Sequence, residues 1–355
     1  MKYSNVYKEC AVGTIQLGVD TFGDVTLGPD GALQSQAQTI RDLIAQAELA
    51  DRVGLDSFGV GEHHRDDFAV SSPETVLAAI AARTERIIVA SAVTVLSSDD
   101  PVRVFQRFAT VDAISGGRAE AVLGRGSFTE SFPLFGYRLE DYETLFAEKL
   151  ELFTRLIEEK PVSWSGRTRA ALDEQNVYPR TETGLRTWVA VGGSPESVIR
   201  TAEHGLPMIL AIIGGDPLRF EPFARLFRDA EAKFGGGRQP LAVHSPGHVA
   251  ATDDQAKDEL WPHYQRMHAR IGRERGWGPL SRENFEAEAG PGGALHVGSP
   301  ETVAAKILRT HRVLGNDRFQ LKYANGTMPH EQLMSSLELY GREVAPIVRD
   351  TLAAG

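Results

Sequence analysis

A cluster of ionisable side chains follows an apolar stretch near the start of the chain, and its residue types are those that bind metals or transfer protons. The apolar stretch, Leu55 to Val60, predicts a buried strand, and Glu62, His63, His64 and Arg65 come directly after it. Charged and imidazole groups at the end of a buried strand lose hydration free energy unless something pairs with them. They therefore predict either a structural polar network or the wall of a pocket.

A metal site is the first interpretation to weigh for this cluster. Glu62, His63, His64, Asp66 and Asp67 are ligand types, but they lack zinc-type spacing and have no second cluster to complete a site. Adjacent residues on a strand point to opposite sides, so only one of the two histidines readily faces a pocket. We expect no metal. A structural network and a proton-transfer or cofactor contact through His63 both stay open on these residues alone.

A second candidate site is the stretch Gly192-Gly193-Ser194-Pro195-Glu196-Ser197. The glycines let the backbone approach a ligand closely, and Ser-Pro begins a helix whose free N–H groups favour an anion. Ser194 and Ser197 add hydroxyl donors. Arg125, which follows Gly124 at the end of another expected strand, adds the permanently charged, bidentate partner that a phosphate prefers. The alternative interpretation is an ordinary capped helix start.

The elements that must position these residues form a regular alternation of strands and helices. Apolar, β-branched runs predict strands at residues 11–19, 55–60, 87–96, 118–123, 187–191, 208–213, 241–250 and 318–323. Helices with a buried stripe at three- and four-residue spacing separate them, and nothing groups into a second domain. We therefore predict one α/β domain over residues 1–355, a (β/α)8 TIM barrel with insertions.

Two segments interrupt the alternation. Residues 161–186 contain two extended pieces and a turn, which predicts a hairpin outside the main sheet. Residues 274–294 are rich in Gly and Pro and predict a long irregular segment, either a functional lid loop or a flexible linker.

In a barrel the carboxyl ends of all strands meet at one mouth, where active sites lie. His63, Arg125 and the stretch 192–197 are therefore expected at the same end, with His244 and His248 as core or pocket wall.

Composition excludes several classes of partner. The chain has 38 Lys and Arg against 48 Asp and Glu, a net charge of −10, so we expect it to bind neither nucleic acid nor an anionic membrane surface. No apolar run is long enough for a membrane span, and the first residues lack the apolar core of a signal peptide. The single cysteine, Cys10, fits a reducing compartment. We expect a cytoplasmic protein.

Several motifs, taken together and in order, resemble the bacterial luciferase-like, flavin-dependent monooxygenase superfamily, also called the LLM class of flavin-dependent oxidoreductases. They are Glu62-His63-His64, residues 84–87, residues 92–96, Pro101-Val102-Arg103, residues 115–118, Arg125-Gly126, Leu134-Phe135-Gly136, residues 202–210, residues 297–301 and Ala324-Asn325-Gly326. The match runs nearly end to end. It implies a (β/α)8 barrel that binds FMN or, in some branches, the deazaflavin F420.

The resemblance also implies roles for single residues. His63 matches a catalytic histidine beside the flavin, and Ala92-Val93 matches a non-proline cis peptide that bulges against the isoalloxazine ring. The cofactor-binding positions it implies are Ala92, Val93, Gly124, Arg125, Gly192, Gly193, Ser194 and Ser197. Residues 274–294 match a mobile lid. Gly124 stands where luciferase has a reactive cysteine, which argues against light emission and a long-chain aldehyde substrate.

The resemblance implies an FMN-dependent oxidoreductase, a monooxygenase that uses reduced FMN and O2 on a small organic substrate. A separate flavin reductase would supply the FMNH2, because no Gly-x-Gly-x-x-Gly unit follows a strand here to bind NAD(P)H. Two alternatives are an F420-dependent reductase or dehydrogenase on the same barrel and a non-catalytic flavin-binding protein.

Alanine-rich helices expected at residues 73–83 and 101–115 resemble those through which the family dimerises, so we expect a homodimer.

Overall fold

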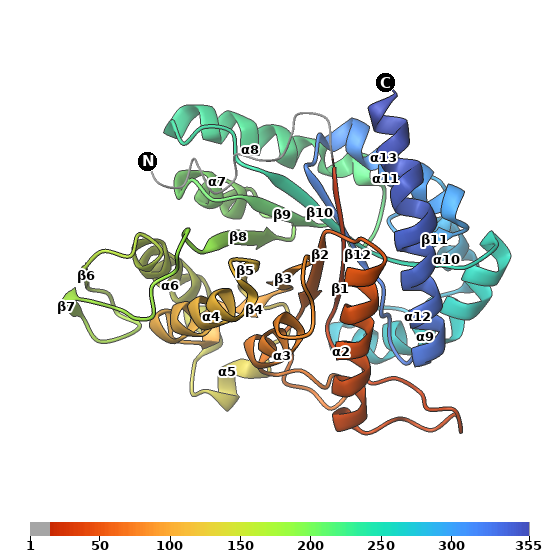
Figure 1. Ribbon diagram of the computed structural model, residues 1–355, viewed down its shortest axis with the longest axis horizontal. Coiled ribbons are helices and arrows are strands. Elements are labelled where there is room, and N and C mark those ends of the chain that lie inside the picture. Colours follow the sequence, from red (N-terminus) through yellow and green to blue (C-terminus); the bar gives the residue numbers. More distant parts are fainter. Residues whose placement is uncertain (1–14, 355) are drawn as a thin grey trace.

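A closed barrel of eight parallel strands forms the centre of the molecule, with helices around it (Figure 1). The computed structural model describes residues 15–354. Each strand pairs with the next around the ring, and the last pairs with the first. In ring order the strands are β1 Gln16–Thr21, β2 Ser57–Val60, β3 Ile88–Ser91, β5 Ala119–Gly124, β8 Arg186–Val191, β9 Met208–Ala211, β10 Leu241–Val249 and β12 Arg318–Lys322. The predicted TIM barrel is confirmed.

Helices cover the outside of the barrel, one or more after nearly every strand. They are α2 Gln36–Arg52, α3 Pro73–Ala81, α4 Pro101–Ser115, α6 Tyr142–Leu156, α7 Pro195–Glu203, α8 Glu221–Phe234, α9 Asp253–Arg275, α11 Pro300–Leu314, α12 His330–Leu339 and α13 Ala345–Ala353. Many begin where a Ser, Thr or Asp side chain accepts a hydrogen bond from an N–H of the first turn, as at Ser35, Asp100, Thr252 and Ser299.

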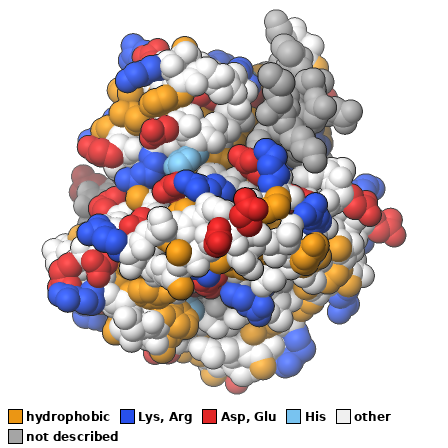
Figure 2. Space-filling view, turned by 90° about the vertical axis from the view of Figure 1, so that its left-hand side faces the viewer, with side chains coloured by type: hydrophobic (Ala, Val, Ile, Leu, Met, Phe, Trp, Pro, Cys, Tyr) orange, Lys and Arg blue, Asp and Glu red, His pale blue; other side chains and the backbone are white. Residues whose placement is uncertain are grey.

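Shorter elements complete the described chain. They are strands β4 Thr94–Val95 and β11 His296–Gly298, helices α5 Ser131–Leu134 and α10 Arg282–Ala289, the 3₁₀ turns Leu96–Ser98, Leu139–Asp141 and Pro217–Phe220, and the π-helical turn Tyr340–Val344. No helix within residues 15–354 is both long enough and apolar enough to cross a membrane. Figure 2 shows Lys and Arg side chains interspersed with Asp and Glu on one face of the molecule.

Two expectations about single elements change, and a third is confirmed. The strand expected over residues 87–96 is broken by a cis peptide bond between Ala92 and Val93, after which the chain resumes as β4 beside β5. The strand expected over residues 11–19 begins at Gln16 in the described part, and its first residues, with Cys10, lie outside the described residues. The extended pieces expected within 161–186 are present as β6 Val162–Trp164 and β7 Leu172–Gln175, an antiparallel pair outside the barrel.

The segment 274–294 is not irregular throughout, so that part of the expectation is wrong. Helix α9 continues to Arg275, and the eight-residue helix α10 then packs its buried Phe285 against Trp261 and Tyr264 of α9, with ring centroids 5.1 Å and 5.9 Å apart. Ser281 caps α10 by accepting from the N–H of Asn284. The glycines and prolines on both sides of α10 concealed a helix that tertiary packing stabilises.

Side chains fill the inside of the barrel in layers. At the amino ends of the strands, Glu120 and Arg318 form a two-pronged ion pair of 2.6 Å and 3.1 Å, with each side chain at most 2% exposed. The guanidinium of Arg318 lies over the ring of Trp188, 4.6 Å from its centroid. The middle layer is apolar and consists of Ala90, Val122, Trp188, Ile209 and Ala242. Because these layers are filled, a ligand can enter the barrel only at its carboxyl end.

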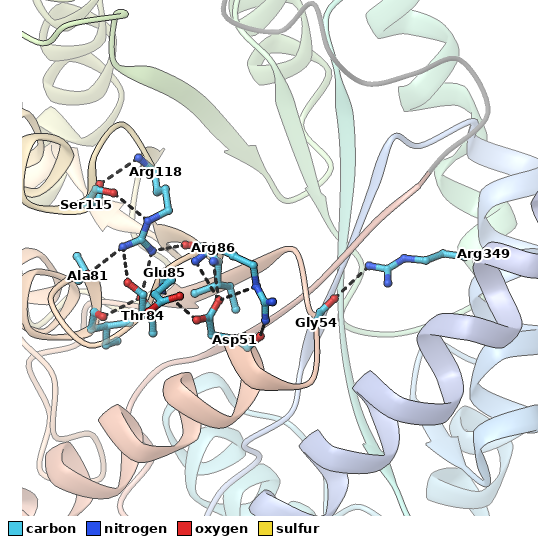
Figure 3. A network of polar contacts seen from close by, with 11 residues as sticks. Asp51, Gly54, Ala81, Thr84, Glu85, Arg86, Ser115, Arg118 and Arg349 are labelled. Atoms are coloured by element: carbon cyan, nitrogen blue, oxygen red, sulfur yellow. Dashed lines mark hydrogen bonds and ion pairs between the residues drawn. The ribbon is translucent and has the colours of Figure 1, made fainter.

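A polar network joins α2, β3 and β5 at the amino ends of the strands (Figure 3). Asp51 accepts hydrogen bonds from the backbone N–H groups of Glu85, Arg86 and Ile87, at 3.0, 3.2 and 2.8 Å. Arg118 donates to the carbonyls of residues 81, 84 and 87. Two of the motifs that carry the family resemblance, residues 84–87 and 115–118, thus hold the floor of the barrel together.

Replacing Asp51 with Asn should lower the free energy of unfolding by about 1–3 kcal/mol, because buried N–H groups lose a charged acceptor. Burial raises the pKa of Asp51, but the three backbone N–H groups outweigh it and hold this pKa below its usual range. The stabilisation is therefore complete above the unfolded pKa, about 4, and is lost as pH falls through the lower folded value. Urea unfolding of both proteins should show their difference shrinking below about pH 4. An unchanged difference would contradict this account.

Candidate active site

The candidate site residues lie at the carboxyl end of the barrel, as expected. His63 follows β2, the cis peptide Ala92–Val93 follows β3, Arg125 follows β5 and the stretch 192–197 follows β8. Parallel pairing around the ring brings these strand ends to one mouth. Their side chains form two clusters, an aromatic one around His63 and a cationic one around Arg125.

The imidazole of His63 lies among three phenylalanine rings. Phe68 stacks on it with ring centroids 4.3 Å apart, and Phe22 and Phe128 contact it edge-on at 4.9 Å and 5.0 Å. The rings come from the loops after β1, β2 and β5. The backbone N–H of His63 donates to the carbonyl of Val70 at 2.9 Å, which fixes the start of its loop.

This environment keeps His63 uncharged. Burial, together with the positive charges of Lys322 and Arg65 and the neighbouring His64, lowers the pKa of His63 to about 3. At neutral pH the imidazole is therefore neutral, so it can accept a proton or donate a neutral N–H, but it does not serve as a cation. Sequence alone could not show this, because the largest cause is burial, which depends on how the folded chain packs around His63.

Glu62 and His64 form a structural network beside this cluster. His64 Nε2 and Glu62 Oε1 are 2.8 Å apart, and Glu62 Oε2 accepts from the N–H of Val95, also at 2.8 Å. Glu62 thereby ties the end of β2 to the chain just after the cis peptide. His64 contacts Phe135 rather than the rings around His63. Within residues 15–354 no three His, Cys, Asp or Glu side chains are grouped to hold a metal ion.

The expected cis peptide between Ala92 and Val93 is present, and Gly124 lies directly against it. A Cβ on Gly124 would lie 2.5 Å from a methyl carbon of Val93, so any side chain here would collide with that residue. Val93 instead packs onto the apolar layer inside the barrel, beside Val122 and Trp188. The Val93 side chain therefore occupies the space that a side chain at position 124 would need, and a cysteine could not replace Gly124 without moving Val93.

The cationic cluster contains one residue that the sequence analysis missed. Arg125 and Arg200 both form ion pairs with Glu143, the second at 3.4 Å. Arg200 lies on α7, three residues after Ser197, so the two share a face of the helix. That spacing from a predicted phosphate-binding helix start was the signal that could have identified it.

Two donors in this cluster lack hydrogen-bond partners among the residues that the structure describes. The hydroxyl of Ser197 and Nη1 of Arg200 are buried and unpaired. Ser194 caps α7 by accepting from the N–H of Ser197, and its hydroxyl donates to Glu196 at 2.7 Å. Gly193 has a φ of +103°, which a side chain rarely adopts. Buried donors at a helix N-terminus beside two guanidinium groups favour an anion such as phosphate.

Arg65 joins three segments above His63. Its guanidinium donates to Asp67 at 3.0 Å, to Glu130 at 2.6 Å and to Glu274 at 2.6 and 2.7 Å, and its side chain is only 5% exposed. It also lies over the ring of Phe128, 4.7 Å from the centroid. The loops after β2 and β5 and the end of α9 are thus held together as a cover over the aromatic cluster.

The two histidines of β10 have different partners. His244 Nδ1 is 2.8 Å from Asp20 of β1 inside the barrel, whereas His248 Nε2 is 2.7 Å from Glu259 of the outer helix α9. Both side chains are buried or nearly so, as expected for core or pocket wall. Only His244 lies near the aromatic cluster, with its ring stacked against Phe22 at 6.0 Å.

A comparison with known families matches residues 21–317 to the model described as luciferase-like monooxygenase. The chain belongs to the luciferase-like monooxygenase family. Among curated relatives, it is 27% identical over 316 residues to 4-hydroxyprotoasukamycin monooxygenase of Streptomyces nodosus subsp. asukaensis, covering 84% of each chain. The family resemblance inferred from the motifs is confirmed, and the chain is an oxidoreductase of the monooxygenase type.

Solved structures show the same fold. The monooxygenase RslO1 from Streptomyces bottropensis superposes with a TM-score of 0.81 at 24% identity, covering 94% of this chain and 99% of that one. The oxygenating constituent of 3,6-diketocamphane monooxygenase from Pseudomonas putida, in complex with FMN, gives 0.75 at 20% identity, with coverages of 94% and 99%. An F420-dependent secondary alcohol dehydrogenase gives 0.73 at 16%, with coverages of 95% and 100%.

Replacing His63 with Asn should change how stability depends on pH. The folded pKa of His63, about 3, is below its unfolded value of about 6.5, so its burial uncharged costs stability increasingly as pH falls below about 6.5. Between about pH 6 and 4, the free energy of unfolding of the wild-type protein should therefore fall by up to about 1.4 kcal/mol per pH unit more than that of the variant. Urea unfolding across this range measures it. Parallel pH curves for the two proteins would show that His63 is not buried uncharged.

Proposed function

We propose that this family member is an FMN-dependent monooxygenase that uses reduced FMN and O2 to oxidise a small organic substrate. The observation that carries the choice of cofactor is the pair of buried, unpaired donors at the start of α7, Ser197 Oγ and Arg200 Nη1, beside Arg125. A phosphate monoester satisfies both donors and balances two positive charges. The FMN-bound neighbour with the same fold supports the assignment.

The chain offers a consistent set of residues to hold FMN. Arg125, Arg200, Ser194 and Ser197 would bind the phosphate, with Gly192 and Gly193 allowing the backbone to approach it. The cis peptide Ala92–Val93, with Gly124 beneath it, would support the isoalloxazine ring between this phosphate site and His63. When bound, reduced FMN supplies the electrons that activate O2, while the protein supplies position and exclusion of water.

The residues of the mouth suit that role in two ways. His63 is neutral, so it can hold or accept a proton at the reacting centre without placing a charge there. The three phenylalanine rings and the cover held by Arg65 exclude water from the same place. The expected lid at residues 274–294 contributes to the cover through Glu274, which accepts two hydrogen bonds from Arg65.

The phosphate assignment predicts that Arg200→Ala and Arg125→Ala each weaken FMN binding about 10- to 100-fold, because each removes a charge-assisted contact. Riboflavin, which lacks the phosphate, should bind all three proteins alike. Arg342→Ala is a suitable control, since Arg342 is exposed, lies in the π-helical turn Tyr340–Val344 and forms an ion pair with Glu338. Fluorescence titration of the flavins measures these affinities. Equal losses for FMN and riboflavin would contradict a phosphate site.

Turnover tests the whole proposal. Purified protein with FMN and a separate flavin reductase should consume O2 in response to decanal, camphor or a phenol, and His63→Gln should lower this response by about 100-fold or more while keeping FMN affinity. Gln retains a neutral donor and acceptor but cannot accept a proton. Undiminished oxidation by His63→Gln would remove His63 from the reaction. Tight FMN binding without O2 consumption with any added substrate would favour the non-catalytic flavin-binding alternative.

An F420-dependent reductase or dehydrogenase is the second candidate, because a solved F420-dependent alcohol dehydrogenase has the same barrel. Titrating the protein with both cofactors separates the two proposals, since each predicts tight binding of only one.

We also propose that a separate flavin reductase supplies FMNH2 and that the chain forms a homodimer through α3 and α4. The exposed Ile114 on α4, 46% accessible, supports a covered surface there. Light scattering that finds a monomer would contradict the dimer.

A further inference from the structure

A hydrogen-bonded carboxylate and imidazole lie at the centre of the barrel mouth, and the roles proposed above leave them unused. Asp20 of β1 and His244 of β10 are 224 residues apart in the sequence, yet Asp20 Oδ2 and His244 Nδ1 are 2.8 Å apart. Asp20 is 1% exposed and His244 is 9% exposed, so the imidazole retains a small opening to the mouth while the carboxylate has none.

The pair lies next to the proposed flavin pocket. Gly59, on the strand between β1 and β3, has no side chain, and a Cβ there would be 2.8 Å from the Cβ of Asp20 and 3.0 Å from that of Ala92. Asp20 is therefore adjacent to the first residue of the cis peptide. Phe22 lies between the two histidines, with its ring stacked near His244 and its edge against His63.

The hydrogen bond determines which nitrogen of His244 is basic. An ionised carboxylate only accepts, so His244 Nδ1 carries the hydrogen that is donated to Asp20. The lone pair of the neutral imidazole is then on Nε2, which has no hydrogen-bond partner among residues 15–354. This is the arrangement in which a carboxylate orients a histidine to act as a base.

Charged and neutral groups of several elements lie around His244. Lys322 of β12 lies over the ring of Phe22, 4.6 Å from its centroid, and forms an ion pair with Asp24 at 3.2 Å. On β12 the neighbouring Gln320 is neutral, and β9 presents only apolar residues to this position. Beyond Phe22, His63 is uncharged. Asp20 Oδ1 is buried without a hydrogen-bond partner among residues 15–354, and a proton on His244 would form an ion pair with this carboxylate.

We propose that His244 is a second acid–base residue of this site, positioned by Asp20, and that it accepts a proton from a weakly acidic O–H group of the substrate. The O–H bond breaks, its electron pair stays on the substrate oxygen, and the proton bonds to Nε2, giving an imidazolium next to the Asp20 carboxylate. No electrons leave or enter in this step. The inference rests on the proposed monooxygenase function. It assigns the substrate proton to His244, while the uncharged His63 serves at the reacting centre.

The other histidine of β10 provides a matched control. His248 is equally bonded to a carboxylate, at 2.7 Å, but it is 0% exposed and its partner belongs to the outer helix α9. Its remaining nitrogen, Nδ1, is buried and unpaired. The same strand therefore carries a second carboxylate-bonded histidine, one that only packs. His248→Gln should lower stability as the loss of such a pair does, but it should not lower the rate of the reaction.

The direct test is nitrogen NMR of the full-length, ¹⁵N-histidine-labelled protein loaded with FMN, with His244→Gln used to assign the resonance. We expect His244 to be the tautomer with hydrogen on Nδ1, to shift on adding FMN, and to titrate on Nε2 while the protein stays folded. Asp20→Asn should remove the preference for this tautomer. Hydrogen on Nε2, or a resonance that neither shifts with FMN nor titrates before unfolding, would overturn the proposal.

Kinetics provides the second test, with a phenol as the substrate, because decanal and camphor carry no O–H group. His244→Gln should lower kcat by about 100-fold and remove the acidic limb of its pH profile, whereas His248→Gln should leave that limb in place. Asp20→Asn should shift the limb and lower kcat less. FMN affinity should stay within about threefold in all variants, since none lies in the phosphate site. An unchanged pH profile in His244→Gln would overturn the proposal.

The two tests separate this inference from the proposed function. If wild-type protein binds FMN but oxidises nothing, the monooxygenase proposal fails, while the NMR result still decides whether His244 is a poised base. If wild-type protein oxidises the phenol and His244→Gln is as active as His248→Gln, the monooxygenase proposal survives and the role of His244 fails.

Discussion

The filled interior of the barrel is the constraint on which the rest of the molecule depends. The ion pair of Glu120 and Arg318, the ring of Trp188 above it and an apolar layer leave no path through the barrel. Removing one partner of such a pair would leave a buried charge unpaired, which is costly, so the floor is maintained as a unit. All chemistry is thereby confined to the carboxyl end, where the polar layer of Asp20, His244 and Lys322 begins.

The mouth above this floor is divided between two electrostatic environments. Around His63, aromatic rings and nearby positive charges remove the charge from the imidazole. Around His244, the nearest polar partner is instead the buried carboxylate of Asp20, 2.8 Å from Nδ1. The cationic cluster of Arg125 and Arg200 lies apart from both, and the single carboxylate of Glu143 balances only one of its two charges. We therefore propose that the mouth binds an anion, excludes water and exchanges protons at separate places.

The family motifs divide by the end of the barrel on which they lie. Residues 84–87 and 115–118 join the strands at the amino ends, where Asp51 and Arg118 satisfy backbone groups. Glu62-His63-His64 and Arg125-Gly126 lie at the mouth. Even within one motif the roles differ, because Glu62 and His64 brace the rim while His63 enters the aromatic cluster. Motif membership alone does not distinguish a residue that supports the fold from one that performs chemistry.

The sequence by itself determined the local features: the eight strands, the helix starts, the glycine-rich anion loop and the order of motifs that placed His63 and Arg125 at one mouth. These follow from periodicity, capping and turn chemistry, which depend on near neighbours in the chain. Helix α10 escaped prediction because glycines and prolines flank it and its stability comes from packing on α9. Only the tertiary structure paired Asp20 with His244, set Arg200 beside Arg125 and made His63 neutral. Ring closure joins residues distant in sequence, and burial, which shifts a pKa, belongs to the assembled core.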